Sequence, residues 1–137
     1  MIGILIISHG AFGEALIHCA SHVLGKRPLR VRQVGITVHD DPEAILPIAR
    51  DMARQLDEGQ GVLVLTDMVG ATPANIATKL YEPGKVAVVS GANLPMLVRA
   101  LTYRNEALNT VAAKAMSGGH DGIVHLPPQG PNAATGN

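Results

Sequence analysis

The chain has very few aromatic residues: its 137 residues include two Tyr, one Phe and no Trp. The hydrophobic core must therefore be built from Val, Ile, Leu, Ala and Met. With 47% hydrophobic residues in total, disorder of the whole chain is not expected, and its length fits one domain. The lack of aromatic side chains for bases to stack on argues against single-stranded nucleic-acid binding.

An excess of charge of either sign is also missing, because 11 Lys and Arg residues balance 11 Asp and Glu residues. No basic cluster marks a surface for nucleic acid or for an anionic membrane, so we expect protein or small-molecule partners. The single cysteine, Cys19, cannot form an internal disulfide. The apolar segment 1–7 is too short to span a bilayer and lacks the features of a signal peptide. We therefore expect a cytoplasmic protein with no membrane insertion.

Four short runs rich in β-branched residues predict strands. They are residues 2–8, 31–38, 62–66 and 86–90. The first, third and fourth runs are almost continuously apolar, which is typical of strands buried on both faces of a parallel sheet.

Segments with helical spacing of apolar residues lie between the predicted strands. They are residues 12–24, 42–56, 74–80, 94–103 and 106–116. Asp41 before Pro42 and Thr72 before Pro73 each place an N-cap residue before a first-turn proline. Gly25 is a stop signal for the first helix, and Ser117-Gly118-Gly119 is expected to end the last one. This alternation predicts an α/β fold with helices on both faces of a mainly parallel sheet.

A weak fifth strand is predicted at residues 122–126, which would complete a single domain over residues 1–126. The polar segment 127–137 contains no core residues and is predicted to be a disordered tail. No internal repeat and no second domain are evident in the sequence.

The loops after the first and third strands are the expected place for chemistry, because ligands of open α/β sheets bind beyond the carboxyl ends of the strands. The first strand ends at His9, and Asp67 follows the third strand. A carboxylate bound to one ring nitrogen fixes the histidine tautomer and leaves the other nitrogen free as a nucleophile. On the residues alone, such a pair is as consistent with a structural role as with a catalytic one.

Phosphoryl transfer suits this pair, because it needs mainly positioning and stabilisation of the phosphoryl oxygens. Free N–H groups at the starts of the following helices would supply that stabilisation. The candidate phosphate-binding residues are Gly10, Ala11, Gly70, Ala71 and Thr72, the last also through its hydroxyl. No Gly-rich nucleotide motif is present, and His18 and His22 have no evident third metal ligand. We therefore expect no cofactor and no metal.

Three motifs resemble the mannose/fructose-type IIA component of the bacterial phosphoenolpyruvate:sugar phosphotransferase system. They are Ser8-His9-Gly10, Val64-Leu65-Thr66-Asp67-Met68-Val69-Gly70-Ala71-Thr72-Pro73-Ala74-Asn75 and Gly91-Ala92-Asn93-Leu94-Pro95-Met96-Leu97. The resemblance implies that His9 accepts phosphate from the carrier protein HPr, that Asp67 positions His9, and that Thr72 occupies a Ser/Thr position. It also implies a cytoplasmic homodimer that needs no metal, in which an antiparallel C-terminal strand, here residues 122–126, is exchanged between subunits.

The resemblance leaves the phosphoryl acceptor open. The chain is expected to deliver phosphate to a separate IIB-type protein in sugar uptake, or to use its phosphorylation state as a regulatory signal. A phosphocarrier subunit serving dihydroxyacetone kinase has the same chemistry with another acceptor. A small hydrolase with a His9–Asp67 base is a further alternative, although Ser8 precedes His9 on the strand and should point away from it.

Overall fold

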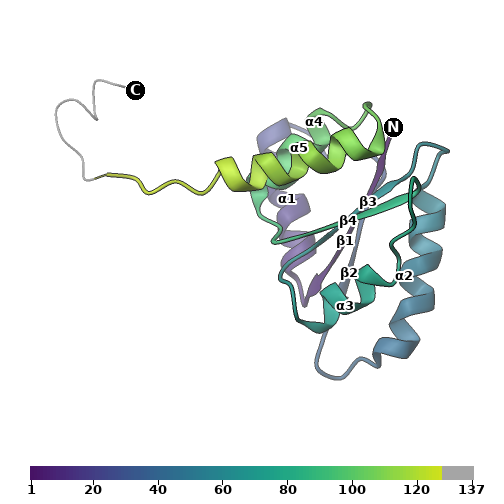
Figure 1. The fold of residues 1–137 in the computed structure, drawn as a ribbon. Helices are drawn as coiled ribbons and strands as arrows, with labels where there is room; N and C mark the ends of the chain where they lie inside the picture. Colours follow the sequence, from purple (N-terminus) through teal and green to yellow (C-terminus); the bar gives the residue numbers. More distant parts are fainter. Residues whose placement is uncertain (128–137) are drawn as a thin grey trace.

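The computed structural model describes residues 1–127 and contains one four-stranded parallel sheet with the strand order β2-β1-β3-β4 (Figure 1). The strands are β1 (Gly3–His9), β2 (Val31–Ile36), β3 (Val62–Thr66) and β4 (Val86–Ser90). The helices are α1 (Phe12–Leu24), α2 (Pro42–Leu56), α3 (Thr72–Thr78), α4 (Leu94–Thr102) and α5 (Leu108–Asp121). The predicted α/β class and the four parallel strands are confirmed.

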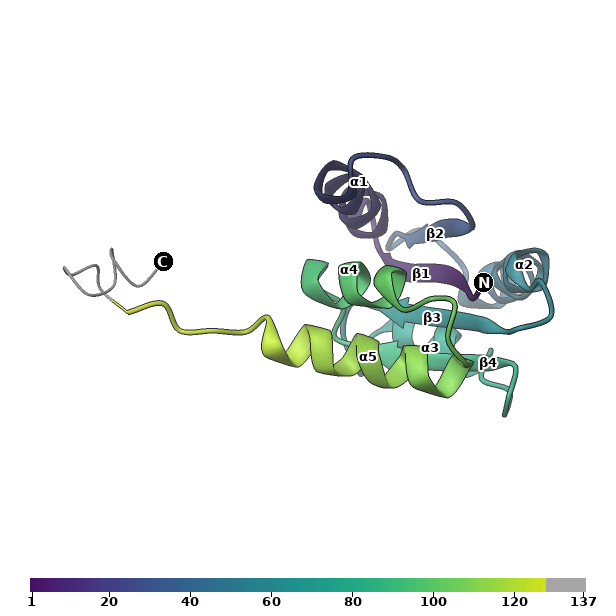
Figure 2. The same cartoon turned by 90° about the horizontal axis from the view of Figure 1, so that it is seen from above.

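Strand β1 lies at the centre of the domain, paired with β2 on one side and β3 on the other. Its even-numbered residues Ile4 and Ile6 pack in a core with α1, α4 and α5, whereas Leu5 and Ile7 pack in a second core with α2 and α3. Figure 2 shows these two helical layers on opposite sides of the sheet. Because both faces are covered, the strand carries an unbroken apolar run, as the sequence pattern indicated.

Two predicted helix boundaries are confirmed by the backbone. Gly25 ends α1 in the left-handed conformation, with φ of 83°. Asp41 caps α2, because its carboxylate accepts the N–H of Glu43 at 3.0 Å. Both signals depend on neighbouring residues alone, which is why they are readable in the sequence.

The predicted N-cap at Thr72 is wrong. Helix α3 begins one residue earlier than expected, because the carbonyl of Ala71 already accepts the N–H of Asn75 at 3.0 Å. The cap position is Ala71, and the exposed Thr72 side chain makes no capping hydrogen bond. The Thr72 hydroxyl therefore does not accept the N-cap hydrogen bond that the sequence predicted.

The last helix also differs from the prediction, because α5 continues through Gly118 and Gly119 to Asp121. Both glycines are buried against α4. A Cβ atom at Gly118 would lie 2.7 Å from the Cβ of Arg99, and one at Gly119 would lie 2.9 Å from Cε of Met96. These glycines allow the two helices to approach closely and do not terminate the helix.

The predicted fifth strand at residues 122–126 is not formed in the described chain. After α5, residues 123–127 run without regular structure or a strand partner, and they lead away from the folded body (Figure 1). They are exposed, so the tertiary structure of one subunit offers them no surface to pair with. Apart from its first residue, the predicted disordered tail at 127–137 lies outside the described residues.

A buried arginine joins the amino-terminal ends of β1 and β2. Arg104 is 7% exposed, and its guanidinium donates hydrogen bonds to the carbonyls of Ile2, Leu29 and Arg30 at 2.6–3.1 Å. These bonds satisfy backbone carbonyls just before β1 and β2, and the carbonyl of Arg30 also accepts the N–H of Ile4 at 3.1 Å. Within residues 1–127, no helix combines the length and the apolarity needed to cross a bilayer.

The α4–α5 contact generates a stability prediction. Gly118→Ala should lower the free energy of unfolding by about 1–3 kcal/mol, because the added methyl group overlaps Arg99. Helix propensity alone predicts the opposite change, an increase in the free energy of unfolding of about 0.5–1 kcal/mol. Urea denaturation measures the difference. Thr110→Ala, at an exposed position of the same helix, is the control and should change stability by less than about 0.5 kcal/mol. A stabilised Gly118→Ala variant would contradict the close packing.

Candidate functional site

His9 and Asp67 meet at the carboxyl edge of the sheet. The parallel register places Ile7 of β1 beside Thr66 of β3, so the residues that follow emerge next to each other. The His9 ring nitrogen Nδ1 lies 2.6 Å from Oδ2 of Asp67, and the His9 backbone N–H donates to the same oxygen at 2.9 Å. The structure thus brings together the two residues that the sequence singled out.

The Asp67 carboxylate is held from both of its oxygens, because Oδ1 accepts the N–H of Met68 at 3.0 Å. Its side chain is 13% exposed, whereas that of His9 is 52% exposed. Partial burial of Asp67 favours its neutral form, but the hydrogen bonds and charge attraction from His9, together with the Met68 N–H, outweigh it and lower the pKa of Asp67. Asp67 is therefore ionised at neutral pH.

An ionised carboxylate only accepts hydrogen bonds, so the hydrogen of the neutral ring lies on Nδ1 of His9. The lone pair is then on Nε2, which makes no hydrogen bond within residues 1–127. A half-exposed imidazole with an unprotonated Nε2 that makes no other hydrogen bond is a competent nucleophile. The geometry thus provides the two features predicted for the His9–Asp67 pair, a tautomer fixed by the carboxylate and a second ring nitrogen that is free.

The candidate phosphate-binding residues lie in the loops after β1 and β3. Gly10 has φ of 50°, and its N–H donates to the carbonyl of Ile36 at 2.9 Å, so this N–H is not available to a ligand. The N–H groups of Ala11, Gly70, Ala71 and Thr72 donate no hydrogen bond to any described residue. Four of the five candidate residues therefore have a backbone N–H that is free to bind a ligand. Gly10 instead allows the turn of the loop through its positive φ.

Gly35 supports the His9 loop, and this role of Gly35 was not predicted from the sequence. It lies in β2, where a Cβ atom would be 2.1 Å from the carbonyl oxygen of Gly10. Only glycine lets the loop after His9 cross the edge of β2 this closely. A glycine inside a strand pattern is the sequence signal for such an approach.

Ser8 does not join the site. It is fully buried, and its Oγ atom has no hydrogen-bond partner among the described residues. The side chain faces α1, where a Cβ atom on Gly13 would lie 3.1 Å from Oγ. Ser8 therefore points away from His9, as expected, and offers no nucleophile to the hydrolase alternative.

The third loop at this edge has a structural role. Asn93 caps α4 by accepting the N–H of Met96 at 3.0 Å, and its amide donates to the carbonyl of Gly119 at 3.0 Å. This loop thus links α4 to α5. His18 and His22 are exposed on α1, and no group of three metal-ligating side chains occurs within residues 1–127.

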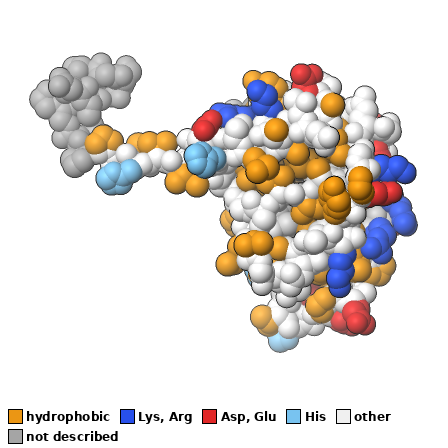
Figure 3. Space-filling model, viewed as in Figure 1, with side chains coloured by type: hydrophobic (Ala, Val, Ile, Leu, Met, Phe, Trp, Pro, Cys, Tyr) orange, Lys and Arg blue, Asp and Glu red, His pale blue; other side chains and the backbone are white. Residues whose placement is uncertain are grey.

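Exposed apolar side chains flank His9 in its two loops. Phe12 is 39% exposed, Met68 is 57% exposed and Val69 is 79% exposed. Figure 3 shows apolar side chains distributed over one face of the molecule. Large apolar side chains beside a reactive residue are typical of a surface that a protein partner covers.

The Asp67 environment generates a pH prediction. In the parent, the Asp67 carboxyl carbon should titrate in NMR spectra below the ordinary value of 3.8. In His9→Ala the midpoint should rise, because the ring hydrogen bond and the charge attraction are removed. Since the pKa is lowered by folding, the ionised carboxylate stabilises the fold above about pH 3.9, and this contribution is lost as the pH falls through the folded-state pKa. His18→Ala is the control, and an equal midpoint in His9→Ala would contradict the coupling.

Comparison with known proteins identifies the family of this chain. A family model described as the PTS system fructose IIA component matches residues 3–116. The mannose-specific EIIAB component from Escherichia coli is 29% identical over 128 residues, which cover 91% of this chain and 39% of that protein. The transcriptional regulatory protein LevR from Bacillus subtilis is 28% identical over 116 residues, or 80% of this chain and 12% of LevR. The chain therefore spans well under half the length of these relatives.

A solved structure extends the similarity to three dimensions. The phosphotransferase system component EIIA from Streptococcus agalactiae has a TM-score of 0.81 and 28% identity, and the match covers 91% of this chain and 97% of that one. The family match spans both the His9 loop and the Asp67 loop. The chain therefore belongs to the fructose IIA component family of the phosphotransferase system.

Proposed function

We propose that this chain is a cytoplasmic phosphocarrier that accepts a phosphoryl group from phospho-HPr on His9 and passes it to a IIB-type protein in sugar uptake. The observation that carries this proposal is the exposed Nε2 of His9, with Nδ1 bound to the ionised Asp67 carboxylate. The name of the Escherichia coli relative, a mannose-specific EIIAB component, supports an acceptor of the IIB type.

The transfer step forms one bond and breaks one. The Nε2 lone pair of His9 attacks phosphorus, and the bond between phosphorus and the donor nitrogen of phospho-HPr breaks with its electron pair returning to that nitrogen. The His9 ring then gains positive charge while Nδ1 keeps its hydrogen against Asp67. A charge-assisted hydrogen bond of this kind contributes about 1.5–3 kcal/mol. The free N–H groups near Ala11 and Thr72, with the Thr72 hydroxyl, are proposed to bind the phosphoryl oxygens.

A protein donor is favoured by the surroundings of His9. The flanking side chains of Phe12, Met68 and Val69 are exposed and apolar, so a partner surface that covers them gains by removing them from water. Covering the site also excludes water from the phosphoryl group during transfer.

Phosphorylation should depend on His9. After incubation with phosphoenolpyruvate, enzyme I and HPr, the intact mass of the parent should increase by one phosphoryl group, and His9→Ala should gain none. Asp67→Asn should slow the transfer by about 10- to 100-fold, because it removes the charge that stabilises the ring. Asp51→Asn, on the exposed side of α2, is the matched control. A phosphorylated His9→Ala variant, or an unslowed Asp67→Asn variant, would contradict the mechanism.

A regulatory binding module is the second candidate function, and the similarity to the transcriptional regulatory protein LevR favours it. In this case phosphorylation of His9 changes the affinity for a partner, and no phosphate is passed on. A phosphocarrier subunit for dihydroxyacetone kinase differs only in its acceptor. Discharge of phosphorylated protein to each acceptor separates these functions.

We further propose that the chain forms a homodimer through the open edge of β4. This strand is at the end of the sheet order, and no described strand pairs with its outer side. A cavity of about 310 Å³ lies between β4 and α5, and it includes Ile123. Ile123, Val124 and Leu126 are 65–79% exposed. Open edges and exposed apolar segments are normally covered, and exchange of residues 122–126 between two copies covers both.

The dimer proposal predicts a change of mass in solution. Ile123→Asp should produce monomer, because a buried carboxylate opposes packing of the exchanged segment against β4. Thr110→Asp, at an exposed position of α5, should leave the dimer intact. Sedimentation equilibrium measures both variants, and a parent that is monomeric at all concentrations would contradict the proposal.

A further inference from the structure

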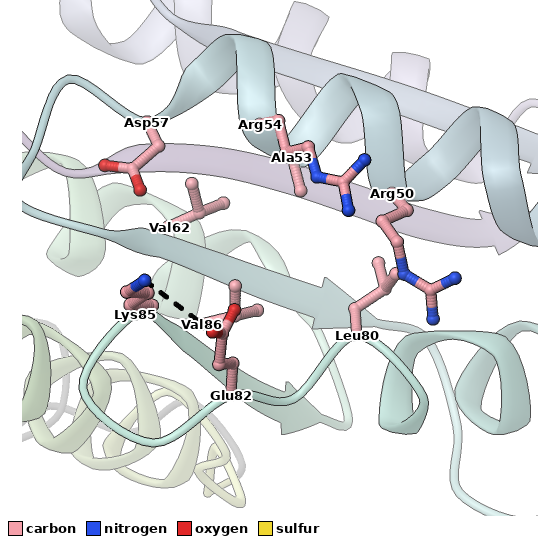
Figure 4. Close-up of a pocket in the computed structure, with 9 residues that line it drawn as sticks. All are labelled: Arg50, Ala53, Arg54, Asp57, Val62, Leu80, Glu82, Lys85 and Val86. Carbon is pink, nitrogen blue, oxygen red and sulfur yellow. Dashed lines mark ion pairs between the residues drawn. The ribbon is translucent and has the colours of Figure 1, made fainter.

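A second concave site lies at the opposite edge of the sheet from His9. The cavity has a volume of about 380 Å³ and lies between the carboxyl-terminal half of α2 and the turn that precedes β4 (Figure 4). Its floor includes Val62 and Val86, the first residues of β3 and β4. Because the strands are parallel, this is the amino-terminal edge, whereas His9 and Asp67 lie at the carboxyl edge.

The rim of this cavity contains three cationic side chains. Arg50 and Arg54 project from successive turns of α2, and Lys85, in the turn before β4, lies toward the Asp57 end of the cavity (Figure 4). Figure 3 shows basic side chains, with a few acidic ones, gathered on the side of the molecule where α2 lies. Positive charges from two elements thus converge on one concavity.

The acidic side chains of the same cavity already have partners. Glu82 forms an ion pair with Lys85 at 3.8 Å. The Asp57 oxygen Oδ1 accepts the N–H groups of Gly59 and Gly61 at 2.7 and 3.0 Å, which holds the loop after α2. Neither carboxylate neutralises the arginines.

Both guanidinium groups remain without a carboxylate partner in the described part of the chain, because none lies within 4.0 Å of Arg50 or Arg54. Within residues 1–127, the one hydrogen bond from either group runs from Arg50 to the carbonyl of Lys79, and it is long at 3.4 Å. One structural explanation is that Arg54 interacts with the carboxyl-terminal dipole of α2. That explanation does not cover Arg50, which lies a full turn earlier.

We propose that this cavity binds a small organic phosphomonoester, with the phosphate between the two guanidinium groups and the organic part on the apolar floor. Arginine presents paired donors that match phosphate oxygens, and two arginines without carboxylates leave these donors available. The floor consists of Ala53, Val62, Leu80 and Val86; the first three are at most 5% exposed, so the floor offers a small apolar area, enough only for a compact body. The cavity volume lies in the range of small-molecule sites. This inference does not rest on the proposed phosphocarrier function.

Phenyl phosphate is a suitable probe, because it joins a phosphate dianion to a compact apolar ring. Titrated into the full chain at millimolar concentrations, it should shift the backbone amide NMR signals of residues 53–57 and 82–86 saturably. Benzyl alcohol, which has the ring without the charge, should produce no saturable shift, and benzoate should bind more weakly. Shifts centred on residues 9–13 and 67–72, or no saturable shift, would overturn the assignment.

Variants then test the arginines. Arg50→Gln and Arg54→Gln should each weaken phenyl phosphate binding by about tenfold, because each removes a charged hydrogen bond. Arg27→Gln is the matched control, since that arginine is paired with Glu14 on α1 and lies outside the cavity. Urea denaturation establishes that all three variants are folded. Unchanged affinity in both cavity variants, or an equal loss in Arg27→Gln, would contradict the site.

The dependence on pH separates phosphate recognition from simple charge attraction. The charged groups facing the ligand are Arg50 and Arg54 of α2, Asp57 directly after it, and Glu82 and Lys85 of the turn. Binding should weaken as the pH falls through about 6, where the phosphate dianion gains its proton. Binding of benzoate should not change there, and a parallel change would overturn the phosphate assignment. His9→Ala should bind phenyl phosphate like the parent, so failure of the phosphocarrier function would not affect this result.

Discussion

The pairing of β1 between β2 and β3 is the constraint on which the rest of the domain depends. The strand is covered on both faces, so its central residues Ile4–Ile7 are all apolar, and its backbone hydrogen bonds determine the register of its neighbours. That register brings the end of β1 next to the end of β3. The 2.6 Å contact between His9 and Asp67 is a direct consequence, because His9 is the last residue of β1 and Asp67 directly follows β3.

The residues that stabilise the domain and the residues of the candidate site lie in different parts of the sheet. The two cores and the Arg104 hydrogen bonds hold the body of the sheet and the amino-terminal ends of its first two strands. The exposed loops at the carboxyl edge carry His9, the free N–H groups and an apolar rim, none of which contributes to a core. Polar groups at the site are therefore free to serve a ligand, and a rigid sheet keeps them in place.

Several features were predictable because they depend on local physics. The strands follow from continuous β-branched runs, and the ends of α1 and α2 follow from Gly25 and Asp41, whose effects involve only adjacent residues. The features that were predicted wrongly, or that a single subunit does not test, depend on distant partners. Gly118 and Gly119 resemble a helix stop, but α4 packs against them, and the helix continues. Residues 122–126 have a strand-like composition, but one subunit provides no strand for them to pair with.

By itself, the sequence determined the fold class, the central buried strands and the two loops that contain His9 and Asp67. These features depend on hydrophobic periodicity and on the position of loops along the chain, and both can be read from the order of the residues. Only the tertiary structure decided that Nδ1 faces the carboxylate, that the N–H of Gly10 is occupied by Ile36, and that Gly35 makes room for the loop. It also decided that Arg50, Arg54 and Lys85, from separate elements, surround one cavity. These properties arise from contacts between residues far apart in the chain, and such contacts exist only after the helices have packed on the sheet.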